Sequence, residues 1–221
     1  MFTAQTFLRK HLDAQPDRYQ PSATLTPTNG RVFVTAAGPP VAIACLGLGA
    51  PAAATLLEHL AGLGVLWFVA VGPAPAIATS LEWGSCVVLD RALRDDGVSQ
   101  HYAAPARYAA SDGPLTGLLC GAAKARGMEP RIGATWTVPT PYRTTAEEFD
   151  AYRDEGILVT ELTTAALFAV ATALGVRAAS AVSVTETLGP PPTAPPPNRR
   201  RGQLITLLEE AVDAVRGRRH V

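Results

Sequence analysis

Residues 161–188 read ELTTAALFAVATALGVRAASAVSVTETL, and this stretch decides the fold that the sequence predicts. It opens with two hydroxyl residues, Thr163 and Thr164, which are typical of the start of a helix. An apolar run follows and ends at Gly175, a residue favoured where a helix stops. Residues 176–185 then predict a buried strand that leads to the acid Glu186. A helix followed directly by a buried strand is typical of an α/β protein.

The same alternation of helix and strand extends over the rest of the chain. We expect helices at 6–14, 52–63, 114–126, 145–154, 161–174 and 204–215, and strands at 31–37, 41–46, 65–71, 85–90, 131–138, 156–160 and 176–185. The pattern predicts one three-layer α/β domain over residues 1–221, with a central mixed, largely parallel β-sheet flanked by helices. A Pro-rich spacer at 189–198, GPPPTAPPPN, precedes the last helix, because such prolines favour extended chain.

Composition and charge restrict the possible partners and location. The chain has 221 residues, and its 19 basic side chains balance 19 acidic ones, which gives no electrostatic case for binding nucleic acid or an anionic membrane. Residues 60–81 carry no charge, but the glycines and prolines among them favour a helix end, a strand and a loop over a membrane span. The N-terminus lacks the apolar core of a signal peptide, so we expect a cytoplasmic protein.

Metal and cofactor motifs are weak. The cysteines at 45, 86 and 120 are far apart and lie in apolar runs, so we expect free thiols and no metal site. Gly47-Leu48-Gly49 lies between a predicted strand and a helix start, where backbone amides can approach an anion. This short motif lacks the remaining residues of a dinucleotide fingerprint or a P-loop, so we expect no cofactor.

Five segments, in their order along the chain, resemble the purine nucleoside and uridine phosphorylase superfamily. GLGAPAAATLLEHLAGLGVLWFVAVG at 47–72 is similar to the family's glycine loop, helix and strand, and LDRALRDDGVSQHY at 89–102 to its Arg-Asp-x-Gly-x-Ser-x-x-Tyr segment. TWTVPTPYRTT at 135–145 is similar to the family's Thr-Thr-Asp-x-x-Tyr-Arg segment. The stretches 161–179 and 180–188 resemble its Glu-Met-Glu helix and its strand ending in Val-Ser-Asp.

The resemblance implies the nucleoside phosphorylase fold and a pocket for a nucleoside-like small molecule. In that pocket a phosphate or an activated water attacks the anomeric carbon of the sugar. A carboxylate holds the ribose hydroxyls, an arginine holds phosphate, and an acid lies near the base. The resemblance also implies a homo-oligomer, either a dimer or a trimer of dimers.

Several positions depart from the family pattern. Thr163 stands where the family has its ribose-binding glutamate, and Leu162 replaces the methionine before it. Ala70 replaces the strand-end arginine, and Pro73 replaces the hydroxyl residue that helps to hold phosphate. The aspartate of the Thr-Thr-Asp segment falls on Pro139, and the family's Gly-Asp-Pro-x-x-Arg loop has no counterpart in this sequence. These changes argue against phosphorolysis, because each removes a charged or polar contact.

The candidate site contains residues that retain polar or aromatic character at the family positions. We assign Glu186 as the acid/base and expect Thr163 and Glu161 to position the sugar. The expected substrate-binding residues are Trp136, Thr137, Tyr142, Arg143, Leu162, Gly49, Ser99 and His101, with Tyr102 beside them.

Each candidate also has a purely structural interpretation. Thr163 and Thr164 are good helix caps, and Glu161 is favoured by the dipole at a helix N-terminus. Trp136 and Tyr142 fit a core or a pocket wall, and His101 fits an exposed loop.

Three functions stay open from the sequence. The first is an enzyme that cleaves a nucleoside-like molecule without phosphate, as a hydrolase or lyase. The second is a family member repurposed for a different reaction on a natural-product substrate, and the third is a non-catalytic binding or assembly partner.

Overall fold

The computed structural model of the protein describes residues 3–22, 32–44, 47–188 and 197–216. Short 3-10 helices lie at Ser99–His101 and Pro141–Arg143. The helices are α1 (Thr3–Asp13), α2 (Ala50–Gly62), α3 (Gly113–Ala125), α4 (Ala146–Asp154), α5 (Thr164–Leu174) and α6 (Pro197–Arg216). The strands are β1 (Tyr19–Pro21), β2 (Val32–Thr35), β3 (Ala42–Ala44), β4 (Trp67–Ala76), β5 (Cys86–Arg94), β6 (Tyr108–Ala110), β7 (Arg131–Thr137), β8 (Ile157–Glu161) and β9 (Arg177–Thr187).

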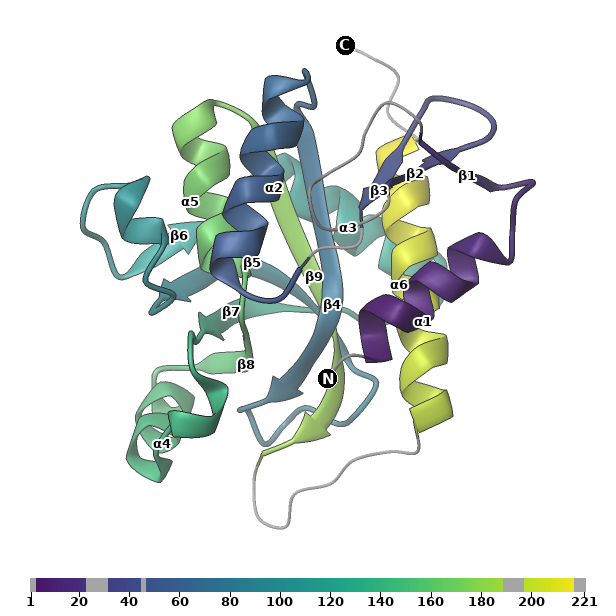
Figure 1. Ribbon diagram of the computed structural model, residues 1–221. Helices are drawn as coiled ribbons and strands as arrows, with labels where there is room; N and C mark the ends of the chain where they lie inside the picture. Colours follow the sequence, from purple (N-terminus) through teal and green to yellow (C-terminus); the bar gives the residue numbers. More distant parts are fainter. Residues whose placement is uncertain (1–2, 23–31, 45–46, 189–196, 217–221) are drawn as a thin grey trace.

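The main sheet is mixed and closes on itself. Its strand order is β6-β5-β7-β8-β4-β9, and β9 also pairs with β5, so five strands form a barrel-like ring with β6 added at β5 (Figure 1). β5, β7 and β8 run parallel to one another, β4 runs parallel to β9, and the two groups meet through antiparallel pairs. The mixed α/β sheet is confirmed. Its closure was not predicted, because the contact between β5 and β9 joins residues that are far apart in the sequence.

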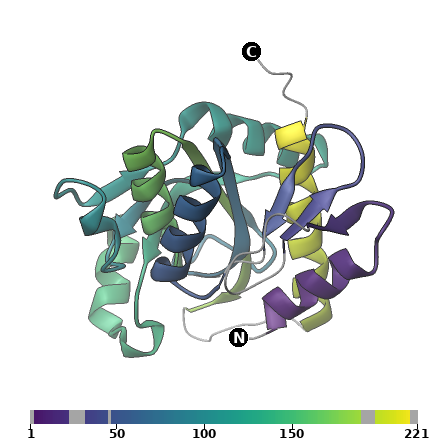
Figure 2. The same ribbon diagram turned by 45° about the horizontal axis from the view of Figure 1, so that its top comes forward.

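Helices cover both faces of the β5–β9–β4 part of the ring, as Figures 1 and 2 show. β9 explains the arrangement, because its side chains alternate between the faces. Ala178, Val182 and Val184 pack with residues of α2 and α5, whereas Ala179 and Ala181 pack with residues of α3 and α6. Both faces of β9 are therefore apolar, which fits its reading as a continuous buried strand.

A small second sheet, β1-β2-β3, lies beside α1 and α6. Leu12 of α1, Phe33 of β2 and Val212 of α6 share one buried cluster. α4 packs on another side of the ring, where Phe149 and Tyr152 contact the completely buried Trp136. Among the described residues, no helix is long and apolar enough to cross a membrane.

Some boundaries differ from the expected ones. β4 continues through Pro73 and Pro75 to Ala76, although the prolines favoured a loop there. Along most of its length β4 pairs only with β9, and the ladder is irregular at Ala74/Pro75. A strand with one unpaired edge and a bulge can accommodate residues that lack an amide proton.

Two further corrections concern the helix ends. Glu161 is the last residue of β8, and α5 begins at Thr164 instead of at residue 161. α6 begins at Pro197, earlier than the expected residue 204, because proline suits the first turn of a helix. Cys45 and most of the predicted Pro-rich spacer lie outside the described residues.

Candidate functional site

The candidate residues of β7 and β8 meet where these two strands end. Thr137 and Glu161 are the last residues of β7 and β8, and the parallel register places them side by side. Thr163 follows as the residue that precedes α5. The structure therefore brings Thr137, Glu161 and Thr163 together.

The Glu161 carboxylate is fully occupied by neighbouring groups. One of its oxygens accepts from the Thr137 hydroxyl at 2.6 Å. The other accepts from the backbone amides of Thr163 and Thr164 at 2.7 and 2.9 Å, and from the Thr163 hydroxyl at 2.9 Å. Thr137 in turn accepts from the amide of Ala165 at 3.0 Å. Glu161 and Thr137 thus satisfy three amides at the start of α5, which a helix cannot satisfy internally.

Thr163 is half-buried and faces this network as a donor. Its hydroxyl proton is directed to Glu161, so the Thr163 oxygen is left as an acceptor for any further group. The expected cap interaction of the Thr163 side chain with the helix backbone is not formed, and Glu161 takes that role.

β4 connects this cluster with Glu186. In the two ladders of β4, Ala76 lies opposite Val159 of β8, and Pro75 lies opposite Glu186 of β9. Glu161 and Glu186 thus flank the same end of β4 from its two sides. Glu186 is half-buried, and its side chain has no hydrogen bond or ion pair to any described residue. Within residues 3–22, 32–44, 47–188 and 197–216, nothing binds the lone pairs of this carboxylate.

The remaining aromatic and basic candidates are placed differently. Trp136 is completely buried and donates its indole N–H to Asp95 at 3.0 Å, while Leu162 packs against the same cluster. Tyr142 and Arg143 lie on the 3-10 helix Pro141–Arg143, and both are exposed, Tyr142 by 85%. The structure does not place Trp136 at an accessible surface.

The loop after β5 is held from inside by Arg94. Its guanidinium donates to the Ser99 hydroxyl and carbonyl at 3.1 and 2.9 Å. It also donates to the carbonyls of Ala103 and Ala104 at 3.2 and 2.7 Å. The buried Asp96 accepts from the Ser99 hydroxyl at 2.6 Å and from the amide of Ser99 at 2.7 Å. The hydroxyl, amide and carbonyl of Ser99 therefore all have hydrogen-bond partners within the protein.

The exposed side of the same loop carries His101 and Tyr102. His101 is exposed, whereas Tyr102 is half-buried and its hydroxyl bonds to Glu58 of α2, which raises the pKa of the tyrosine. The sequence reading did not anticipate Asp96 as the anchor of this loop. The signal was present, because an aspartate three residues before a serine favours a local turn with side-chain caps.

Two glycines before α2, Gly47 and Gly49, stand where a side chain would be unfavourable. Gly49 has a φ of 87°, a conformation that side chains disfavour. A Cβ at Gly47 would lie 2.9 Å from the Cβ of Ala52. Gly49 precedes α2 without any side-chain cap, and Pro51 removes one of the amides of the first turn.

The described residues hold no group of three or more histidine, cysteine or acidic side chains that could bind a metal ion. The described cysteines, Cys86 and Cys120, are buried free thiols, and burial raises the pKa of Cys86 to about 12. Thiolate chemistry at Cys86 is accordingly disfavoured.

Comparison with known proteins gives consistent results. The uridine phosphorylase of Haemophilus influenzae is 31% identical over 163 residues, which cover 66% of this chain and 64% of the relative. The guanosine phosphorylase of Halorubrum lacusprofundi is 30% identical over 151 residues, which cover 68% of this chain and 63% of the relative. The uridine phosphorylase of Escherichia coli is 27% identical over 191 residues, which cover 79% of this chain and 75% of the relative.

The chain thus spans slightly less than two thirds of the first two relatives. The sequence model of the phosphorylase superfamily matches residues 10–212, which is nearly the whole chain. Together with the mixed α/β ring, this match shows that the chain is a divergent member of the phosphorylase superfamily.

Proposed function

We propose that this protein binds a nucleoside-like molecule where β4, β7, β8 and β9 end, and that it cleaves the N-glycosidic bond without phosphate. The observation that carries the proposal is the state of the two acids at this place. Glu161 is occupied by four donors, whereas Glu186 has no partner among the described residues. Glu186 is therefore the acid that can exchange a proton with a ligand.

The proposed reaction is a hydrolysis. The bond between the sugar C1′ and the base nitrogen breaks, and the oxygen of a water molecule bonds to C1′. The proton that the water loses ends on the leaving base, with Glu186 as the group that transfers it. A protonated base is the better leaving group, so an acid beside the base is the useful arrangement.

Two features support a reaction without phosphate. Ala70 and Pro73 of β4 provide neither a cation nor a hydroxyl donor for an anion. The amides of Thr163, Thr164 and Ala165 at the start of α5 are also used by Glu161 and Thr137. A helix N-terminus whose amides are occupied has lost the donors that bind phosphate elsewhere.

Thr163 suggests what kind of sugar fits. Its hydroxyl proton is committed to Glu161, so it offers one oxygen as an acceptor. A carboxylate has two oxygens and can accept from two adjacent sugar hydroxyls at once. We therefore expect this site to favour a deoxy sugar, or another sugar with one hydroxyl at this position, over ribose.

The first experiment measures release of free base from ribonucleosides and 2′-deoxynucleosides, with and without phosphate. We expect turnover that phosphate does not stimulate, and a higher kcat/KM for the deoxy compounds. Glu186→Gln should reduce kcat by at least about a hundredfold. Glu129→Gln, which changes an exposed acid before the opposite end of β7, should not reduce it.

The outcomes separate the alternatives. Activity that depends on phosphate would contradict the proposed reaction. Tight binding without turnover, seen as a thermal shift with nucleosides, would favour the non-catalytic binding protein instead. Absence of any shift with nucleosides would favour a family member repurposed for a different substrate.

A gain-of-function variant tests the role of Thr163. Thr163→Glu restores a carboxylate at this position and should shift the preference from deoxy sugars toward ribose by about tenfold or more. An unchanged preference would remove Thr163 from the sugar site without affecting the proposal for Glu186. The homo-oligomer implied by the family is checked separately by light scattering.

A further inference from the structure

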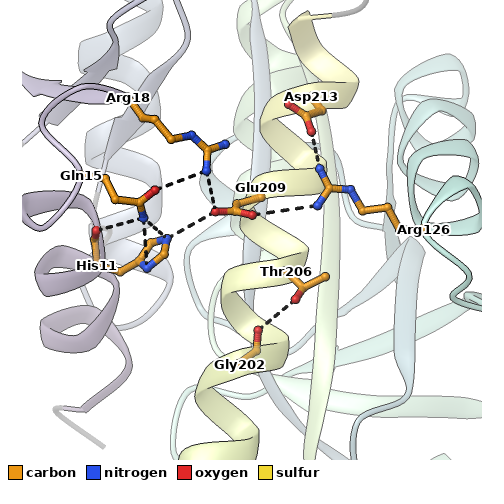
Figure 3. Close-up of polar contacts among 8 residues, drawn as sticks. All are labelled: His11, Gln15, Arg18, Arg126, Gly202, Thr206, Glu209 and Asp213. Carbon is orange, nitrogen blue, oxygen red and sulfur yellow. Dashed lines mark hydrogen bonds and ion pairs between the residues drawn. The ribbon is translucent and has the colours of Figure 1, made fainter.

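Glu210 of α6 is a buried acid outside the candidate site. Only 2% of its surface is exposed, and neither carboxylate oxygen has a hydrogen-bond partner among the described residues. Its neighbours on the same helix are paired. Figure 3 shows Arg126, the residue after α3, between Glu209 and Asp213, and Glu209 also contacts His11 and Arg18. Glu210 is thus the acid of this helix that faces the protein interior.

The surroundings of Glu210 come from the ring and from α3. Cys86 of β5 lies close enough for Glu210 to raise the pKa of its thiol, and Ser183 of β9 is opposite Cys86 in the ladder. The Ser183 hydroxyl is buried and also has no partner among the described residues. The rest of the surroundings are apolar: Leu119, Ala181 and Leu207 belong to the same buried cluster as Cys86.

The described charged and titratable groups around Glu210 are few. Arg126, directly after α3, is the cation, Asp213 is the acid of α6 that acts on Glu210, and Cys86 is the titratable group of β5. β9 contributes the neutral Ser183, and β4 contributes Trp67, Val69 and Val71 at the edge of the cluster. An ionised carboxylate in this place would be desolvated without a direct partner, which is strongly unfavourable.

We propose that protonation of Glu210 controls how tightly α6 packs on the ring. The neutral acid is compatible with the packing that the structure shows. Ionisation draws Arg126 away from Asp213 toward Glu210 and loosens the contact of α6 with α3, β5 and β9. α6 also reaches the region of the candidate site, because Gln203 fills the space above Gly84, and Gly84 bonds to the carbonyl of Val184, two residues before Glu186.

The direction of the effect with pH follows from the acid's surroundings. Burial raises the pKa of Glu210 from its ordinary value of 4.5 to about 7, with Arg126 lowering it and Asp213 raising it. The packed state then binds more protons than the loosened state between these two values. Packing of α6 is strongest below pH 4.5, weakens as the pH rises to about 7, and is constant above that.

Hydrogen–deuterium exchange of α6 amides, corrected for the intrinsic effect of pH, measures this packing. The matched variant is Glu210→Gln, which keeps the shape and removes the charge. We expect the exchange-competent fraction of the wild type, divided by that of Glu210→Gln, to rise by about two orders of magnitude between pH 4.5 and 7. The ratio should then stay level up to pH 8.5.

The control is Glu209→Gln, which removes the paired acid next in the sequence. It should weaken α6 at every pH and retain the change between pH 4.5 and 7. A constant ratio of wild type to Glu210→Gln over this range would overturn the proposal. Should Glu210→Gln not fold, NMR titration of the Glu210 carboxyl carbon in the wild type decides the question, because a midpoint near 4.5 would equally overturn it.

Discussion

At the scale of single residues, the Glu161 carboxylate is bound by groups of the protein itself. Four donors surround its carboxylate, and three of them come from Thr163 and Thr164. An acid bound in this way orders the start of α5 and has little capacity left for a ligand. The Glu186 carboxylate, by contrast, has no hydrogen bond or ion pair to a described residue, which is why we propose it as the acid that acts on a ligand.

Thr137 connects the Glu161 carboxylate with the start of α5. Thr137→Val keeps the shape but removes the donor to Glu161 and the acceptor for the amide of Ala165. We expect a loss of about 2–3 kcal/mol in the free energy of unfolding, because the buried amide of Ala165 loses its acceptor and one Glu161 oxygen loses its donor.

Urea denaturation measures the effect of Thr137→Val. The matched control is Thr135→Val on the same strand, whose hydroxyl makes one hydrogen bond of 3.3 Å to the carbonyl of Val159. It should cost about 1 kcal/mol or less. Equal losses in the two variants would mean that the two hydrogen bonds of Thr137 add no more to stability than the single bond of Thr135.

At the scale of elements, the loop after β5 depends on one guanidinium. Arg94 reaches Ser99, Ala103 and Ala104 from the end of β5 and so connects both sides of the loop. Arg94→Lys keeps the positive charge, but a single ammonium group cannot span acceptors that lie in several directions. The loop with His101 and Tyr102 should therefore loosen.

Limited proteolysis and thermal unfolding measure that effect. We expect faster cleavage within residues 95–106 and a destabilisation of about 2–3 kcal/mol. Arg91→Lys is the control, since Arg91 is exposed and pairs with its neighbour Asp90 and the ring of Tyr108. It should change stability by less than about 0.5 kcal/mol, and cleavage as fast as in Arg94→Lys would argue against the role of Arg94.

The elements also show what the sequence could and could not predict. The helices and buried strands were predicted because their apolar periodicity is local, as in α5 and β9. The course of β4 through Pro73 and Pro75 was not, because tolerance for proline depends on which edge of a strand is paired. β1 and β6, with three residues each, are too short to give a periodic signal.

The candidate site was predictable in part for the same reason. Thr137, Glu161 and Thr163 were selected from separate segments, and the structure brings them together. The sequence left Trp136 and Tyr142 open as core or pocket-wall residues, and it could not tell them apart, because both stand in one polar segment; the structure buries Trp136 and exposes Tyr142. Their roles toward a ligand remain predictions.

At the scale of the whole molecule, Glu155 connects two distant parts of the chain. It binds Arg107 through two hydrogen bonds and also accepts from the Tyr108 hydroxyl at the start of β6. The bonds from Arg107 and Tyr108 lower the pKa of Glu155 to about 2. The unfolded chain therefore binds this proton at a higher pH than the folded protein does.

This pKa predicts an acid-dependent loss of stability. The contribution of Glu155 is present above pH 4.5 and is lost as the pH falls toward 2. Thermal unfolding of Glu155→Gln should show a smaller drop in Tm between pH 4.5 and 2.5 than the wild type. Because the pair is exposed, the difference should be modest, and a larger drop in the variant would contradict the assignment.

The closed ring has a consequence for how the chain folds. β9 is the last of the described strands, yet it pairs with both β4 and β5 and joins the two groups of parallel strands. During synthesis, the edges of β4 and β5 that pair with β9 stay unpaired until residues 177–187 have been made. Contacts over such sequence distances slow folding and expose edges that can aggregate. Of all the strands, β9 should therefore be the one whose late arrival governs the yield of folded protein.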